Sequence, residues 1–149
     1  MTVTAAASRL KSSPDYHLDT QIGFLLRQAH QRHTTIFAAL MIEDLTPTQW
    51  AAIAKLRELG PCSQNALGRQ TAMDAATIKG VIDRLTKRGL TATTPDKTDG
   101  RRLTVALSEA GIAVYERAKP IADRISRETL APIGLDDYAA FIALLRKLI

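Results

Sequence analysis

The residues with the clearest chemical potential lie near position 100, where Asp99 and Gly100 are followed by Arg101 and Arg102. Asp-Gly favours a tight turn, and the flanking segments "LTATT" and "RLTVAL" are rich in strand-forming residues. The stretch therefore predicts a β-hairpin with two guanidinium groups beside its tip, and we expect Asp99 to orient the guanidinium of Arg101. A guanidinium binds phosphate and enters a narrow minor groove more readily than an ammonium, so this pattern indicates DNA binding.

The positive charge of the chain is concentrated around this hairpin. The net charge is +5 and the pI is about 9.7. Residues 61–102 carry eight Lys or Arg against four acids. Phosphate binding requires such a local field, because neutralising phosphates releases counterions. On charge alone, a solvated basic surface explains the distribution equally well.

A helix-turn-helix is predicted directly before the hairpin. Ser63 caps a short helix from residue 64 to about residue 71, and Asp74 caps a second helix from residue 75 to about residue 88, closed by Gly89. The second helix of this motif reads base edges in the major groove. Its inward stripe is predicted to be Ile78, Val81, Ile82 and Leu85. Taken alone, it is equally an amphipathic helix with a solvated face.

The predicted DNA-binding residues are small or polar side chains on the outward face of this helix, at the start of the preceding helix and on the hairpin. They are Ser63, Gln64, Ala75, Ala76, Thr77, Lys79, Arg84, Lys97, Asp99, Arg101 and Arg102. Small residues permit close approach to base edges, while lysine and arginine reach guanine acceptors or phosphates.

Helices are predicted on both sides of this region. Apolar residues at helical spacing predict a first helix over residues 16–43. Thr46 and Gln49 then form a capping box, with Pro47 at the first helical position, and start a helix that ends at Gly60-Pro61.

After the hairpin, Ser108 caps a long helix that runs to about Leu130 and is bent by Pro120, and Asp136 caps a last helix. The predicted fold class is mainly α with a small β-hairpin wing, a winged helix-turn-helix flanked by terminal helices.

These motifs resemble the MarR-type winged-helix transcriptional regulators. The wing signature of that family is matched by Asp99, Arg101, Leu107, Ser108 and Gly111. "LTPTQW" is similar to the opening of the family's second helix, and "IDRLTKRGL" to the exit of its recognition helix. The resemblance covers residues 18–149.

The resemblance implies a single domain over residues 1–149. Residues 16–45 and 108–149 would be dimerisation helices of an obligate homodimer, and residues 46–107 a DNA-binding lobe. It also implies a ligand pocket at the junction of the dimer and the DNA-binding parts. Thr93 and Thr94 stand where the family often has an arginine, which implies fewer phosphate contacts from the first wing strand. Two segments, "LRQAHQRHTTIF" and "GPCSQNALGRQTAMDAATIKGVIDRL", look like the branch that controls nicotinate breakdown.

A pocket for a small aromatic acid is predicted between the first helix and the helix that carries Trp50. Aromatic walls with a few convergent polar groups suit such a ligand. The predicted ligand-binding residues are Phe24, Arg27, His30, His33, Gln49 and Trp50. Two alternative interpretations remain open. His33 is then a histidine of an interface whose hydrogen bonds are satisfied, and Trp50 packs in the core.

No cofactor is predicted. His17, His30, His33 and Cys62 lack a carboxylate cluster and make a weak zinc signal. Cys62 has no flanking cation to lower its pKa, so burial is favoured over a redox role. The single cysteine excludes an intramolecular disulfide, and "MTVTAAASRLKSSP" lacks the apolar stretch of a signal peptide, so we expect a cytoplasmic protein without a membrane span.

An enzyme is not expected, because the sequence has no Gly-rich phosphate loop, nucleophile elbow or metal pair motif. The predicted function is a homodimeric repressor, released from a pseudo-palindromic operator by a (hydroxy)nicotinate- or benzoate-like acid. The alternatives are a non-sequence-specific architectural DNA binder, a partner-binding adaptor, or a redox- or metal-responsive regulator of the same fold.

Overall fold

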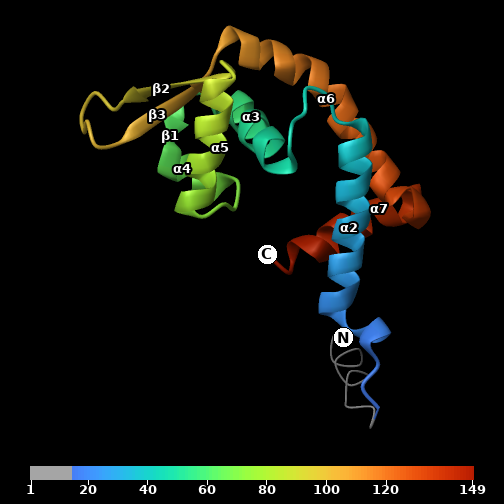
Figure 1. Cartoon of the computed structure of the whole chain (residues 1–149). Helices are drawn as coiled ribbons and strands as arrows, with labels where there is room; N and C mark the ends of the chain where they lie inside the picture. The colour runs from blue at the N-terminus through green and yellow to red at the C-terminus, as the bar shows by residue number, and fades with distance from the viewer. Residues whose placement is uncertain (1–14) are drawn as a thin grey trace.

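The structure is a computed structural model that describes residues 15–149, so the expectation for the N-terminal segment concerns residues outside this range. Helices dominate, with one small sheet (Figure 1). In chain order the elements are η1 (Leu18–Thr20), α2 (Ile22–Leu40), α3 (Pro47–Leu59), β1 (Cys62–Ser63), α4 (Gln64–Gln70), α5 (Ala75–Lys87), β2 (Thr91–Pro95), β3 (Leu103–Leu107), α6 (Glu109–Leu130), η2 (Ala131–Ile133) and α7 (Leu135–Arg146). The predicted fold class is confirmed. Within the described residues, no helix is long and apolar enough to cross a membrane.

One part of the molecule, which we call the lobe, consists of α3, α4, α5 and a three-stranded antiparallel sheet in the order β1-β3-β2. Strands β2 and β3 form the predicted hairpin, in which Thr91 lies opposite Leu107. Figure 1 shows this hairpin projecting from the lobe as a wing. The sequence did not indicate β1, a two-residue strand that pairs Cys62 with Val105.

The lobe encloses a continuous apolar core. Its buried members come from α3, α4, α5, the sheet, the first half of α6 and the segments that precede α3 and β2: Leu45, Ala52, Ile53, Leu56, Leu67, Ile78, Val81, Ile82, Leu85, Leu90, Val105, Val114 and Ala118. Burial of this apolar surface is the main term that stabilises the lobe. The wing and α5 are therefore mounted on a rigid, well-packed base.

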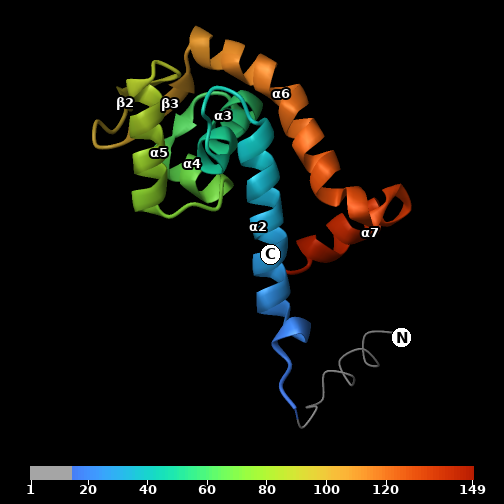
Figure 2. The ribbon, with the colours of Figure 1, turned by 45° about the vertical axis from the view of Figure 1, so that its right-hand side comes forward.

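The second part, which we call the arm, consists of α2, the portion of α6 beyond Pro120, and α7. Figure 2 shows α6 passing over the lobe and descending to α7, with α2 beside it. Arg32 Nη2 donates to the carbonyl of Glu128 at 2.8 Å and so ties α2 to the end of α6. Phe37 and Ile125 are buried here, whereas α7 has no buried residue.

Large apolar side chains are exposed along the arm. They are Tyr16, Leu18, Ile22, Leu25, Leu26, Leu135, Tyr138, Phe141, Leu144, Leu145, Leu148 and Ile149. Leu26, Tyr138, Phe141 and Leu145 line one cavity together, and an exposed apolar surface of this kind marks an interaction site more often than a solvent-facing surface.

Most predicted helix starts are confirmed. The side chains of Thr46, Ser63, Asp74 and Ser108 each accept a hydrogen bond from the backbone N–H three residues on. Thr46 and Gln49 complete the predicted capping box. These signals are local, so the sequence alone places the helix starts.

The predicted ends of the first helix were wrong. His17 accepts from both the amide and the hydroxyl of Thr20, which makes a 3-10 turn before Gln21 extends the chain and α2 begins at Ile22. At the other end, Met41 is extended and Glu43 has a positive φ, so α2 ends at Leu40 and does not continue to residue 43.

The predicted N-cap of the last helix was also wrong. Gly134, with φ of 83°, occupies the N-cap position, and α7 begins at Leu135. Asp136 therefore lies inside the first turn, and the N-cap residue makes no side-chain capping bond. The 3-10 turn η2 fixes where the chain can re-enter a helix, and the glycine supplies the left-handed conformation needed there.

Candidate nucleic-acid interface and ligand pocket

Helix α5 separates its two faces as predicted. Ile78, Val81, Ile82 and Leu85 are at most 2% exposed, and they hold the helix against the core. The outward residues Ala75, Ala76, Thr77, Lys79 and Arg84 are exposed, and Gly80 is half-buried. The burial pattern leaves one continuous polar face with small side chains near its start.

The start of α5 is fixed by Asp74. Its Oδ1 accepts the backbone N–H of Thr77 at 2.7 Å. That hydrogen bond lowers the pKa of the Asp74 carboxyl below its ordinary value. The first turn of α5 is therefore held in place while its small side chains remain free to approach a ligand.

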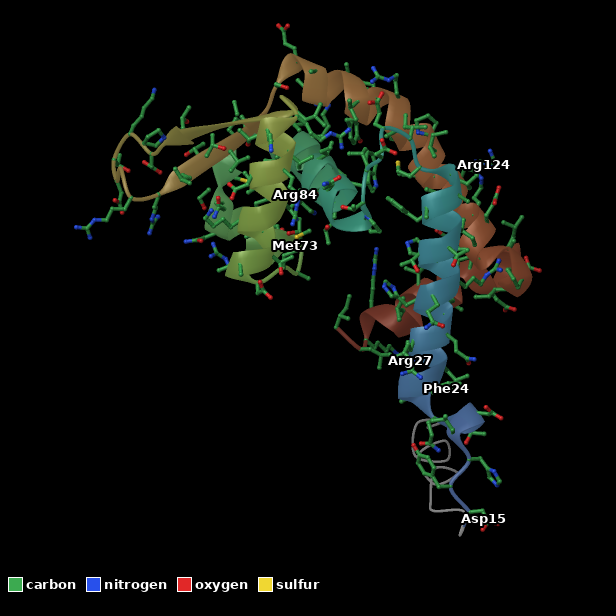
Figure 3. The ribbon with its side chains drawn as sticks, viewed as in Figure 1. Asp15, Phe24, Arg27, Met73, Arg84 and Arg124 are labelled. Atoms are coloured by element: carbon green, nitrogen blue, oxygen red, sulfur yellow. The ribbon has the colours of Figure 1, made fainter. Side chains whose placement is uncertain are left out.

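The cations on α5 are available for a ligand. Lys79 Nζ lies 2.8 Å from Asp83 Oδ2, and both side chains are more than half exposed. An exposed pair of this kind is weak, so a phosphate or base can replace the aspartate. Arg84 lies across Gly80, where an added Cβ would meet Arg84 Nη1 at 3.5 Å. Figure 3 labels Arg84 on α5 and Met73 in the turn before it.

The wing tip is organised by two aspartates. Asp96 Oδ1 accepts the amide and the hydroxyl of Thr98, each at 2.8 Å. These hydrogen bonds, the amide first, lower the pKa of Asp96. Lys97, between the wing strands, is exposed. The tip thus has internal hydrogen bonds of its own.

The role predicted for Asp99 needs correction. Its Oδ1 accepts the backbone N–H of Arg101 at 3.0 Å, and its Oδ2 lies 3.9 Å from Nε of Arg102. In the described residues its contact with a guanidinium is therefore to Arg102, because the turn brings the residue three positions on within reach. The guanidinium of Arg101 is left to solvent.

The structure brings the wing arginines together with the start of α4. Arg101 and Arg102 line a pocket of about 110 Å³ with Ser63, Gln64 and Asn65. Within the described residues, Gln64 Oε1 is a buried side-chain oxygen without a hydrogen-bond partner. Asn65 was not among the predicted residues. Its position next to Gln64, at the start of the same helix, is the feature of the sequence that could have indicated it.

The base of the wing is fastened to α5 by threonines. Thr86 Oγ1 lies 2.8 Å from Thr91 Oγ1 and 3.4 Å from Thr93 Oγ1. Ser108 Oγ donates to the carbonyl of Gly89 at 2.6 Å. Where the resemblance leads us to expect an arginine in this strand, the chain instead has a side chain that ties strand to helix. This contact was not predicted from the sequence.

Two predicted ligand residues, His30 and His33, line a largely apolar cavity of about 580 Å³ between α2, α6 and α7. Thr129 donates its hydroxyl proton to the carbonyl of Ile125 at 2.8 Å. Nδ1 of His33, 3.0 Å from Thr129 Oγ1, is therefore the donor in that contact. Burial, and then the charge of His30, lower the pKa of His33. A neutral His33 with Nδ1 used in this way keeps Nε2 as an acceptor.

The other predicted ligand residues lie elsewhere in the single chain. Arg27 lies over the ring of Phe24, 5.5 Å from its centroid. Figure 3 shows both at the end of α2 that is remote from α3. Trp50 stacks on Tyr115 of α6 at 5.5 Å, and Gln49 is buried within the capping box. The packing interpretation of Trp50 thus fits the chain, and of the six predicted residues only His30 and His33 line the cavity between α2, α6 and α7.

Metal and redox chemistry find little support in residues 15–149. That part of the chain holds no group of three His, Cys, Asp or Glu placed to bind a metal. Cys62 is half-buried in β1, and burial raises the pKa of its thiol. A raised pKa reduces the thiolate fraction on which oxidation depends.

Comparison with known proteins extends these observations. A family model described as MarR family matches residues 45–103. The HTH-type transcriptional repressor NicR of Pseudomonas putida is 38% identical over 147 residues, which cover 98% of this chain and 92% of that protein. A probable transcriptional regulator from Pseudomonas aeruginosa has a crystal structure that is 55% identical with a TM-score of 0.87, over 89% of this chain and 100% of that one.

A further solved structure is BpsR of Bordetella bronchiseptica, whose DNA binding is regulated by 6-hydroxynicotinic acid. It is 38% identical with a TM-score of 0.86, over 90% of this chain and 96% of that one. The matched portions of these proteins include both the lobe and the arm.

Proposed function

Because the chain belongs to the MarR family of transcriptional regulators, we propose that it is a homodimeric repressor that a small aromatic acid releases from a pseudo-palindromic operator. Its named relatives are regulators and not enzymes. The observation that carries the proposal is that one lobe combines two features. Helix α5 has an exposed face of small and cationic side chains, and the wing places two exposed arginines, Arg101 and Arg102, beside the start of α4.

On DNA, α5 would lie in the major groove with Ala75, Ala76 and Thr77 nearest the base edges. Lys79 and Arg84 would reach guanine acceptors or phosphates. The guanidinium of Arg101, which Asp99 leaves free, would enter the minor groove. Phosphate contacts are proposed for the remaining predicted residues of the interface, namely Ser63, Gln64, Lys97 and Arg102, with Asp99 holding the turn.

A second copy of the chain is the proposed partner of the arm. Helix α7 has no buried residue, and Leu144 is 61% exposed although the side chain is apolar. Residues 16–45 and 108–149 would then form the dimer, and residues 46–107 would bind DNA. A two-fold dimer presents its recognition helices about 34 Å apart, one turn of DNA, which requires a pseudo-palindromic site.

The effector proposed is a carboxylate of the hydroxynicotinate or benzoate class. The DNA binding of BpsR is regulated by 6-hydroxynicotinic acid, and BpsR matches most of the chain, which supports the assignment to the branch that controls nicotinate breakdown. Arg27, His30 or His33 would bind the carboxylate, and Phe24, Gln49 and Trp50 would complete the site. Since the single chain does not gather these side chains, we propose that dimerisation completes the pocket.

DNA recognition is tested by selecting a duplex in vitro and titrating it at several salt concentrations. Arg101→Ala should reduce the slope of log K against log salt by about 0.9, one contact's worth, and weaken the preference for A·T flanks. Arg102→Ala is the matched control: Arg102 is proposed to contact phosphate and not the minor groove, so its loss should leave the preference for A·T flanks unchanged. An unchanged slope and flank preference for Arg101→Ala would exclude the minor-groove role. Binding without a short palindromic footprint would favour the architectural alternative.

The effector is tested by thermal shift with 6-hydroxynicotinic acid as the probe. A ligand at 100 times its Kd stabilises the protein by about 2.7 kcal/mol. Alanine at Arg27, His30 or His33 should reduce this shift while the ligand-free protein still binds operator. If all three variants respond like the wild type, the pocket lies elsewhere.

A further inference from the structure

The linker between α2 and α3 has an unusual backbone. Glu43 and Asp44 are consecutive, neither is glycine, and both have positive φ, 60° and 51°. Side chains other than glycine rarely adopt this region unless surrounding contacts hold them there. Leu45, which follows, is buried in the core, and Thr46 caps α3. The linker is therefore a fixed corner between the arm and the lobe.

Glu43 is held from two directions. Its backbone carbonyl accepts Nη2 of Arg88 at 2.5 Å, and its Oε1 lies 2.7 Å from Nη2 of Arg117. Arg88 is the C-cap residue of α5, and Arg117 belongs to α6. One residue thus joins the end of α5 and the middle of α6 at the corner that connects α2 to α3. We call these contacts the Glu43 junction.

The α6 side of the junction is reinforced. Two residues that precede Arg117 also contact α3: Tyr115 stacks on Trp50, and Glu116 Oε1 lies 3.5 Å from Nε of Arg57. Three consecutive residues of α6 therefore fasten α3 and its linker. A displacement of α6 or α2 moves this assembly as a unit, because packed elements shift between discrete arrangements and do not deform continuously.

We propose that Glu43, Arg88 and Arg117 are positioning residues that carry a displacement of the arm to helix α5. This rests on the proposed function, in which a ligand at the arm changes the placement of the recognition helix. The physical route is short: α2 ends at Leu40, the fixed corner follows, and Arg88 connects the corner to the last turn of α5. Ligand binding and DNA binding are coupled through these contacts only if the contacts differ between the ligand-free and ligand-bound states. The variants below change the contacts.

The first experiment measures hydrogen exchange of the backbone amides in the full-length free protein. Glu43→Gln and Arg117→Gln should each speed exchange in the linker and in the last turn of α5, although Arg117 lies on α6 and pairs with Glu43 of the linker. Arg124→Gln is the matched control, because Arg124 lies on the same helix and pairs with Glu128 within it. The double variant should exchange no faster than the single variants, since both remove the same pair. Unchanged exchange at α5 in all variants would overturn the proposal.

The second experiment measures operator affinity with and without 6-hydroxynicotinic acid. Glu43→Gln and Arg117→Gln should reduce the acid-induced loss of affinity by about threefold, the scale of an exposed ion pair. Arg88→Gln should reduce it by about tenfold, because a charged donor to a carbonyl contributes more. Lys87→Gln controls for a lost charge at the same helix end.

The outcomes are distinguishable. If the wild type responds to the acid and the three junction variants respond to the same extent, transmission through Glu43 is refuted. If the wild type itself binds no operator or ignores the acid, the proposed function fails, and the exchange experiment alone decides whether the junction links the arm to α5.

Discussion

The lobe and the arm are built from the same kinds of residue but are stabilised differently. The lobe has a continuous core in which Ile53, Leu67 and Leu85 are completely buried. The arm buries Phe37 and Ile125, while α7 is exposed along its length. The lobe is therefore fully packed within one chain, whereas the arm presents an apolar surface that a second chain would cover.

The largest expected effect separates core from surface within one helix of the lobe. Ile53→Ala removes a side chain with no exposed area from the middle of α3 and should lower the free energy of unfolding by about 2–5 kcal/mol. Leu59→Ala, on the same helix at 47% exposure, should cost less than about 1 kcal/mol. Urea denaturation measures both. Equal costs would show that the lobe is not packed as described.

The next effect concerns the arm. Leu144→Asp places a charge on the exposed apolar face of α7 and should weaken dimerisation at least tenfold, about 1.4 kcal/mol. Leu59→Asp puts the same charge on an exposed leucine of the lobe and should leave dimerisation unchanged. Sedimentation over a range of concentrations measures both. If the two variants dimerise alike, α7 is not the interface.

How far the sequence predicts this structure differs between the two regions. In the lobe, capping residues such as Thr46 and Asp74 act on neighbours a few positions away, so helix starts follow from the sequence. Strand β1 was not predicted, because its two residues are too few to show a periodicity and they pair with a strand about forty positions further on. The positive φ angles of the corner at Glu43 were not predicted either. Contacts from α5 and α6 hold this backbone in place, and the corner contains no glycine that would indicate such a conformation.

For the candidate site the same division holds. The outward-facing residues of α5 were predictable because the buried stripe from Ile78 to Leu85 determines which face of the helix turns outward. The predicted ligand residues were taken from two helices, α2 and α3, and the packing of their side chains depends on contacts distant in sequence. His33 meets Thr129, and Trp50 meets Tyr115, and neither pairing leaves a local sequence signal.

A smaller effect concerns the stability of the lobe at acidic pH. The Asp74 carboxyl has a lowered pKa because the Thr77 amide bonds to its charged form. As pH falls below about 4, this carboxyl is protonated in the unfolded chain before it is protonated in the folded protein. The stability that the cap contributes therefore decreases until the pH has passed the lower pKa of the folded state. Asp74→Asn and Asp74→Ser keep a capping acceptor without the titration. Their melting temperatures should therefore fall less than that of the wild type between pH 5 and pH 3. These pH limits bracket the ordinary aspartate pKa of about 3.9. Parallel curves would contradict this role of Asp74.

The smallest effect tests the arm near neutral pH. Burial and the His30 charge lower the pKa of His33, so its protonated form is disfavoured in the folded state. Stability from the neutral ring is present above the ordinary value of about 6.5 and is lost as pH falls from there through the folded pKa. His33→Gln should remove this loss, and His30→Gln should move the pKa of His33 upward. NMR titration of the ring protons, with melting curves at each pH, would show whether the arm titrates in this range.

The mass of the protein bound to its selected operator tests whether the chain binds DNA as a dimer that a ligand releases. We expect two chains of 16.3 kDa on each duplex, bound together, with loss of both chains when 6-hydroxynicotinic acid is added. Half-sites filled independently by single chains, at concentrations where the free protein is also monomeric, would contradict it.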